Sequence, residues 1–167
     1  NVQSHLTTAV DTIIDDGNEI FIKTLDYLTF DKGVVKFSYP KYFAYEFEED
    51  YAFKNWTLNG SDFVIMYFEL GVYTELDALT GEMVKSFGVD NCKVEEKKTK
   101  IGEIELSGKR IDVEILGQKL TYDLYRLESN DAKSHFIAFQ DSKKENGGDS
   151  NEYREGLKIL NKTLIYK

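Results

Sequence analysis

The sequence predicts an α+β fold in which an antiparallel β-sheet of about six or more strands is sandwiched between helices, an α/β/α arrangement. Two segments, residues 63–70 and 135–140, are apolar almost throughout, as in strands that are covered on both faces. Two other segments have apolar residues at helical spacing. Short turns join the remaining strands, which favours antiparallel pairing.

Composition narrows the possible classes of protein. The chain has 167 residues, 41% of them hydrophobic, which suffices for one core and predicts one domain. The formal net charge of −9 disfavours nucleic acid and anionic membranes as partners. No apolar run approaches the roughly 18 residues of a membrane-spanning helix. Cys92 is the only cysteine, which excludes an internal disulfide, and we expect a small buried residue there.

The N-terminal segment has a mixed pattern. The apolar residues Val10, Ile13 and Ile14 alternate with acids in a way that suits either a short helical turn or a strand. Asp16-Gly17-Asn18 is a turn signal. We therefore interpret residues 1–26 as an N-terminal arm or tether, and residues 27–167 as a single domain.

From Tyr27 onward the pattern becomes that of strands. Gly33 lies in a short connection between residues 27–30 and 34–39 and predicts a hairpin, after which Pro40 interrupts the ladder. The further strands expected in this half are residues 42–48, 53–58 and 63–70.

The first helix is expected at residues 75–87. Leu76, Leu79, Met83 and Phe87 recur at helical spacing and form one apolar stripe. Thr74 and Asp77 resemble a capping box at the start of this helix, and Gly88 suits its end.

The second half of the chain begins with strands. They are expected at residues 92–97, 102–106, 110–115, 120–127 and 135–140, with an inward face made of Ile104, Leu106, Ile111, Val113 and Ile115. Residues 110–127 form a hairpin that turns at Gly117.

A polar loop at residues 141–150 leads into the last helix. Ser150 is its expected cap, and Tyr153, Leu157, Leu160 and Leu164 form its buried stripe. Gly156 on the same side predicts a close approach to the sheet.

Three segments resemble the PsbP-like fold family, which includes Mog-type Ran-binding proteins and many bacterial secreted proteins or lipoproteins. They are Val35-Lys36-Phe37-Ser38-Tyr39-Pro40-Lys41, the helix at residues 74–87, and Phe136-Ile137-Ala138-Phe139 with the loop and helix that follow. In that family a Trp often follows the Tyr-Pro pair, whereas here Phe43 is the nearest aromatic residue and Trp56 lies further on. The resemblance covers residues 27–167 and implies a non-catalytic accessory or binding role. A cystatin-like or NTF2-like α+β fold is the structural alternative, although such folds usually begin with their long helix.

His135 is the main candidate for catalysis. At the start of a buried strand it suits a general base, with Asp141 or Glu128 to orient it. We favour a structural role instead, a hydrogen-bonded residue at a sheet end, because no nucleophile elbow or metal-ligand spacing surrounds it. We therefore assign no catalytic residue.

Metal and cofactor sites are not expected either. Glu46, Glu48, Glu49 and Asp50 offer oxygen ligands of the kind that Ca²⁺ prefers, but no calcium-binding loop surrounds them.

An aromatic cluster is the candidate partner surface. Within residues 39–56 it comprises Tyr39, Tyr42, Tyr45, Tyr51 and Trp56. Aromatic residues are enriched at protein interfaces, although half of a strand's side chains are expected in the core.

The function expected from these observations is that of a non-catalytic accessory or binding domain of the bacterial cell envelope, with a protein as its partner. The domain is expected outside the cytoplasm, as a periplasmic, secreted or lipid-anchored protein, because the chain begins with Asn, as after removal of a leader. The alternatives are a hydrolase or metal-dependent enzyme that uses His135, and an intracellular regulator like the Ran-binding relatives. The oligomeric state is left open.

Overall fold

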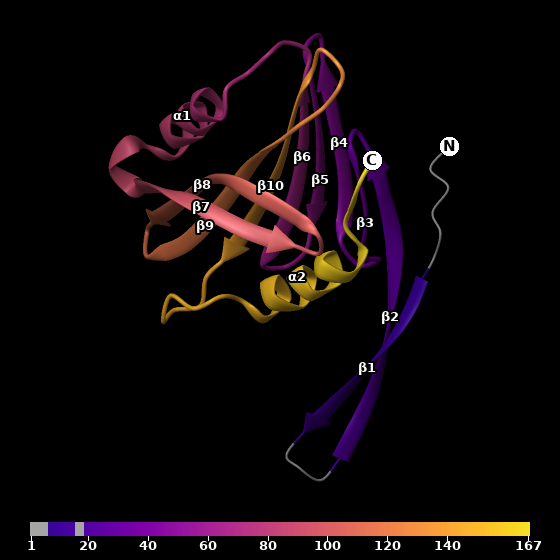
Figure 1. Cartoon of the computed structure of the whole chain (residues 1–167). Helices are drawn as coiled ribbons and strands as arrows, with labels where there is room; N and C mark the ends of the chain where they lie inside the picture. The colour runs from indigo at the N-terminus through magenta and orange to yellow at the C-terminus, as the bar shows by residue number, and fades with distance from the viewer. Residues whose placement is uncertain (1–6, 16–18) are drawn as a thin grey trace.

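Two antiparallel sheets and two α-helices make up the fold (Figure 1). The structure is a computed structural model that describes the backbone of residues 7–15 and 19–167 and the side chains from residue 26 onward. The predicted turn at residues 16–18 lies outside the described residues.

The larger sheet has seven strands in the order β4-β5-β6-β10-β9-β8-β7, and each neighbouring pair is antiparallel. Its strands are β4 (Ala44–Asp50), β5 (Phe53–Asn59), β6 (Phe63–Leu70), β7 (Cys92–Ile101), β8 (Ile104–Ile115), β9 (Gln118–Leu127) and β10 (Ser134–Ser142). The two strands that the sequence marks as doubly buried, β6 and β10, pair at the centre.

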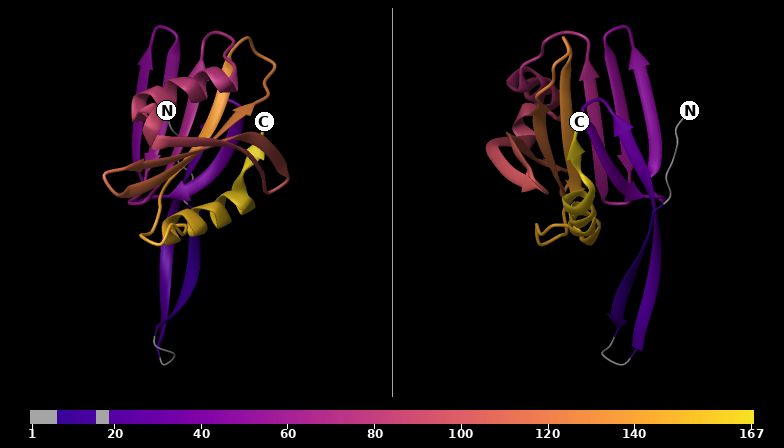
Figure 2. Two further views of the ribbon diagram at one scale, coloured as in Figure 1. Left: turned by 90° about the vertical axis from the view of Figure 1, so that its left-hand side faces the viewer. Right: turned by 45° about the vertical axis from the view of Figure 1, so that its right-hand side comes forward.

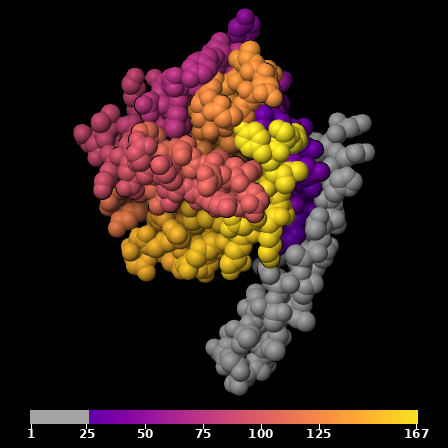
Figure 3. Space-filling view, in the orientation of Figure 1, coloured from indigo at the N-terminus to yellow at the C-terminus, as the bar shows by residue number. Residues whose placement is uncertain are grey.

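The smaller sheet has four strands in the order β1-β2-β3-β11. They are β1 (Thr7–Asp15), β2 (Glu19–Lys32), β3 (Val35–Pro40) and β11 (Ile165–Tyr166). The C-terminus thus returns to the start of the domain, where Lys167 N donates to the carbonyl of Val34. In the space-filling view the last residues, in yellow, lie beside the indigo chain of the smaller sheet (Figure 3).

Helix α1 (Leu76–Phe87) precedes a short 3-10 turn (Val89–Asn91), and α2 (Asn151–Thr163) precedes β11. Figure 2 shows the two helices well apart. Helix α2 packs along β3, and α1 packs on β8 and β9. Ser150 caps α2 as predicted, since its Oγ accepts from the amide of Tyr153. The capping box predicted for α1 is wrong: Glu75 is the cap without a side-chain bond, and the hydroxyl of Thr74 donates to the carbonyl of Val72.

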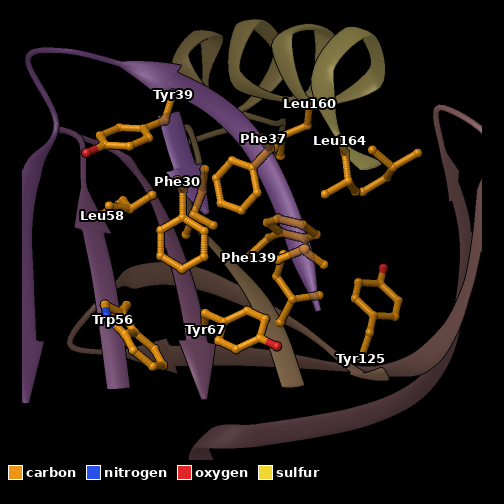
Figure 4. Packing of buried hydrophobic residues seen from close by; sticks show 14 of the residues in the cluster. Phe30, Phe37, Tyr39, Trp56, Leu58, Tyr67, Tyr125, Phe139, Leu160 and Leu164 are labelled. Atoms are coloured by element: carbon orange, nitrogen blue, oxygen red, sulfur yellow. The ribbon is translucent and has the colours of Figure 1, made fainter. Parts of the chain in front are cut away.

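The core lies on one face of the larger sheet, beneath the smaller sheet and α2. Aromatic side chains from both sheets meet there (Figure 4). Phe30 of β2 stacks on Phe37 of β3 with ring centroids 4.9 Å apart, and it also meets Trp56 and Tyr67 of the larger sheet. On the opposite face, the apolar stripe of α1 covers a smaller cluster around Leu124, Phe136 and Ala138.

The α/β/α prediction is therefore wrong, and the fold is mostly β. Strands β6 and β10 are covered on both faces, as their sequences require, but on one face the cover is a second sheet together with a single helix. A sheet excludes water from an apolar face as well as a helix layer does, so two-sided burial does not reveal which of them is present. The 27–39 hairpin forms this separate layer with β1 and β11 instead of joining the larger sheet.

Strand β8 differs from the prediction in a second way. The sequence favours two strands on either side of Gly108, with all their apolar residues on one inward face. The strand is continuous, because Gly108 packs where an added Cβ would lie 2.0 Å from the carbonyl oxygen of Leu124. Alternation then places Leu106 in the main core and Ile111, five positions later, on the opposite face. Arg110 consequently shares the face of Leu106.

Two glycines in the helices provide a matched pair of substitutions. At Gly156 in α2, an added Cβ would lie 2.4 Å from the ring of Phe63, which is fully buried, whereas at Gly81 in α1 nothing lies within 4 Å. We expect Gly81→Ala to stabilise the protein by about 0.5–1 kcal/mol through helix propensity. Gly156→Ala should destabilise it by about 1–3 kcal/mol because of overpacking. Urea unfolding measures both, and equal effects would contradict the close approach of α2 to β6.

A second pair concerns turns in which the backbone has positive φ. Gly33 (φ +54°) lies where a Cβ would meet the hydroxyl of Tyr67 at 2.0 Å, whereas Gly117 (φ +80°) has nothing within 4 Å. Alanine at either position carries backbone strain of about 1–2 kcal/mol. Gly33→Ala should cost about 1–3 kcal/mol more than Gly117→Ala, since only the first disturbs Tyr67. Thermal or urea unfolding of the two variants compares them directly.

Candidate functional site

Strand β4 is an edge of the larger sheet that is exposed over its whole length. It pairs with β5 on one side, and no described strand pairs with its other side. Every one of its residues is exposed. The edge therefore presents unpaired backbone groups together with the side chains of an aromatic and acidic strand.

The five aromatic residues of the candidate partner surface are divided between the core and this edge. Tyr39 and Trp56 are buried at 4% and 7% exposure. Tyr45 is 43% exposed, Tyr42 is 58% exposed, and Tyr51 protrudes fully from the turn after β4. The structure brings the side chains of Tyr45 and Trp56 together directly. Phe47, which was not among the five, joins them: it is 43% exposed and stacks on Trp56 with ring centroids 5.0 Å apart.

Tyr42 is fixed at the start of β4 by α2. Its hydroxyl donates to Glu152 Oε2 at 2.8 Å, and the other oxygen of Glu152 accepts from the amides of Asp62 and Phe63, both at 2.7 Å. Partial burial of Glu152 opposes ionisation, but these hydrogen bonds outweigh it and lower the pKa of the carboxyl group. One end of the exposed edge is thus tied to the helix.

The acids of β4 have a distinct distribution. Glu46, Glu48 and Asp50 share one side of the strand, and Glu49 lies on the side of Tyr45 and Phe47. The ion pairs formed within the described residues involve other acids. The opposite edge strand, β7, instead mixes lysines with glutamates. Strand β4 is therefore the edge with unneutralised negative charge.

His135 lies in the core and has both ring nitrogens engaged. It is 1% exposed, with Tyr67 Oη 2.8 Å from Nδ1 and the carboxylate of Asp131 2.9 Å from Nε2. The hydroxyl of Tyr67 accepts from the amide of Val34, so its own proton is available to Nδ1, and the ring proton then lies on Nε2 toward Asp131. Neither nitrogen is free for a substrate. Of the expected orienting acids, Asp141 bonds to Ser150 instead, and Asp131 takes the position that Asp141 or Glu128 was expected to hold.

A polar cluster lies beneath α2 on the core face of β8 and β9. Arg110 donates to both carboxylate oxygens of Asp123, from Nε at 2.6 Å and from Nη2 at 2.8 Å. Asp123 is 2% exposed, and the hydroxyl of Tyr153 lies 3.5 Å from it. The Asp123 hydrogen bond raises the pKa of Arg110. The pair lines a cavity of about 270 Å³ between the sheet and α2.

The polar loop at residues 141–150 is anchored at both ends. Asp141 is fully buried and accepts from Ser150 Oγ at 2.5 Å and from the Ser150 amide at 3.1 Å. Lys143 forms an ion pair with Asp149, and its ammonium group lies 5.6 Å from the centre of the Tyr153 ring. The loop also borders two further pockets, of about 580 and 510 Å³, that share Lys119, Leu120 and Lys143.

Sequence reasoning missed the Arg110–Asp123 cluster. A signal was present in β9. Asp123 lies on the same face of this strand as Thr121 and Tyr125, and both of those residues are buried. A charged residue at an inward position needs a partner. Arg110 was not recognised as this partner because the prediction put Ile111 and Val113 on the core face of the strand, which would turn Arg110 away from Asp123.

The structure gives no sign of a protein-built metal centre in the part of the chain that it describes, since no group of three or more His, Cys, Asp or Glu side chains is placed to hold an ion. In the same residues, neither helix is long and apolar enough to cross a membrane.

The Asp131 carboxylate gives a prediction about pH. Its hydrogen bond with His135 is the largest of several that lower its pKa to about 2, from an ordinary value of 3.8. A carboxyl group with a lowered folded-state pKa stabilises the fold above pH 4, and this contribution is lost as the pH falls toward 2. Wild type should therefore exceed Asp131→Asn in Tm at pH 5–7, and the gap should shrink between about pH 4 and pH 2.

Thermal unfolding across this pH range measures the gap. Asp90→Asn, at an exposed acid on the 3-10 turn, serves as the control and should show no such pH-dependent gap. A gap for Asp131→Asn that stays constant down to pH 2 would contradict the stabilising contact with His135.

Comparison of the chain with family models, with curated proteins and with solved structures finds no match. The resemblance to the PsbP-like family accordingly stays a prediction from three short segments of sequence.

Proposed function

We propose that this domain is a non-catalytic binding module that docks an extended, basic segment of another protein along β4. The observation that carries the proposal is the exposed, acidic and aromatic edge of the larger sheet. A strand added at such an edge forms backbone hydrogen bonds with the unpaired groups of β4, and its alternate side chains determine specificity.

Side-chain chemistry identifies the occupant. Tyr45 and Phe47 offer an apolar side, with Phe47 supported from below by Trp56, and such supported aromatics are common binding hot spots. Glu46, Glu48 and Asp50 offer an acidic side. A segment that alternates basic and apolar residues matches both sides at once.

A second copy of the chain fits this edge poorly. Pairing β4 with another β4 would place acids opposite acids, and like charges in cross-strand pairs are destabilising. Charge therefore favours a basic partner over self-association. We also propose that the domain has an accessory role outside the cytoplasm, which the PsbP-like resemblance supports.

The test uses two synthetic peptides, one that alternates lysine and valine and one that alternates glutamate and valine. We expect the lysine peptide to bind in calorimetric titration, more weakly at higher salt, and the glutamate peptide not to bind. Tyr45→Ala should weaken binding by about tenfold, the loss typical of a hot-spot aromatic. The double variant Glu46→Lys/Glu48→Lys should abolish the preference for lysine.

Matched controls are available elsewhere on the surface. Tyr73→Ala removes an aromatic side chain that is 66% exposed, near α1, and Glu103→Lys/Glu105→Lys makes the same charge change at the turn between β7 and β8. Neither should alter binding. No binding of the lysine peptide, or equal weakening by the control variants, would overturn the proposal.

A further inference from the structure

The cavity beneath α2 contains hydrogen-bonding groups that the fold itself does not use. Tyr125 of β9 is 1% exposed as a whole residue. Its hydroxyl forms no hydrogen bond with any described residue, but it is not one of the fully enclosed atoms that lack a partner: it lines the cavity and points toward α2 (Figure 4). Its hydrogen-bond partner is therefore whatever occupies the cavity, water or a ligand. Burial raises the pKa of Tyr125, so the group is a neutral donor at ordinary pH.

The same cavity is lined by other donors with spare capacity. Arg110 uses Nε and Nη2 for Asp123, and its Nη1 has no partner among the described residues. Lys97 and Thr99, from the edge strand β7, also line the cavity, and neither side chain forms an ion pair or hydrogen bond within the described chain. The cavity therefore has more free donors than free acceptors.

Its two carboxylates are already occupied. Asp123 accepts the bidentate contact from Arg110, and Asp149 is paired with Lys143. A ligand has to bring acceptors. With Arg110 paired to Asp123 and Lys143 paired to Asp149, Lys97 is the cation left without an acid, so a ligand with a single negative charge balances the site. A planar carboxylate also matches the geometry of a guanidinium group.

The remaining walls are apolar. Ile101 closes one end of β7, Phe139 comes from β10 and Leu157 comes from α2. A volume of about 270 Å³ lies just below the range of about 300–1,000 Å³ that is usual for drug-sized ligands, so the ligand is small. Gly108 lets the ring of Tyr125 pack against β8, since a Cβ there would lie 2.7 Å from that ring.

We propose that this cavity binds a small carboxylic acid with a short apolar body. Arg110 and Lys97 hold its carboxylate, and the Tyr125 hydroxyl donates to it. The apolar body packs against Phe139 and Leu157. The cavity is on the core face beneath α2, whereas β4 is a sheet edge formed by other residues, so this proposal does not depend on strand addition there.

The probes are isobutyrate, benzoate and cyclohexanecarboxylate, with benzamide as the uncharged counterpart of benzoate. At least one carboxylate should bind with a Kd of about 1 mM or tighter in calorimetric titration, and it should raise the Tm with the logarithm of its concentration above the Kd. Benzamide should bind at least tenfold more weakly than benzoate if benzoate is the ligand that fits.

Tyr125→Phe is the decisive variant. It removes only a hydroxyl that has no partner in the fold, so the protein should fold with unchanged or slightly higher Tm. Its affinity for the carboxylate should fall by about tenfold, the loss expected for a hydrogen bond to a charged group. Lys97→Gln should weaken binding as well, since Lys97 forms no ion pair in the described chain.

Tyr122→Phe is the matched control on the same strand. Tyr122 faces the other side of the sheet, where its ring lies 5.0 Å from that of Phe87. Tyr122→Phe should leave carboxylate affinity unchanged. The proposal is overturned if none of the three carboxylates binds to wild type, or if Tyr125→Phe binds them as well as wild type does. It is also overturned if benzoate binds and benzamide binds with the same affinity.

Discussion

The two sheets are held together around Tyr67, and the rest of the structure depends on this contact. Its ring packs between Phe30 of the smaller sheet and Trp56 of the larger one, with centroid distances of 5.7 and 5.8 Å. Its hydroxyl accepts from the amide of Val34 and contacts Nδ1 of His135, so the turn of the 27–39 hairpin is tied to the centre of the larger sheet. Gly33 makes the approach possible because it has no side chain. Because the buried hydroxyl of Tyr67 has two directional partners, it fixes the orientation of the two sheets relative to each other in addition to joining them.

The core face of the larger sheet is covered in two parts, an apolar part and a part that contains polar groups. The smaller sheet covers the β5–β6 side, where aromatic rings fill the space between layers (Figure 4). Helix α2 covers the other side, where Arg110 and Asp123 need each other in order to be buried. The cavity with Tyr125 lies on this second side, between α2 and strands β7 to β10. Strand β4 is the outer strand of the larger sheet, and its Phe47 and Tyr45 are only partly covered although Trp56 on the neighbouring strand is buried.

Local signals in the sequence served well where one element determines its own structure. The Ser150 cap, the stripe of α2 and the close approach at Gly156 all follow from spacing and side-chain chemistry. So does the 110–127 hairpin. The errors arose where a residue's role depends on a distant element. Gly108 is a packing position rather than a strand end because Leu124 lies against it.

The sequence by itself determined that this chain has an antiparallel core with two doubly covered strands and two amphipathic helices, because periodicity and caps are local properties. The tertiary structure alone decided that a second sheet supplies part of the cover, since an apolar face does not specify what packs on it. It also decided which aromatic residues of the 39–56 region reach solvent, and that Arg110, Asp123 and Tyr125 share a cavity. These outcomes depend on strand order and on the parity of residues in paired strands, which only the complete set of long-range contacts establishes.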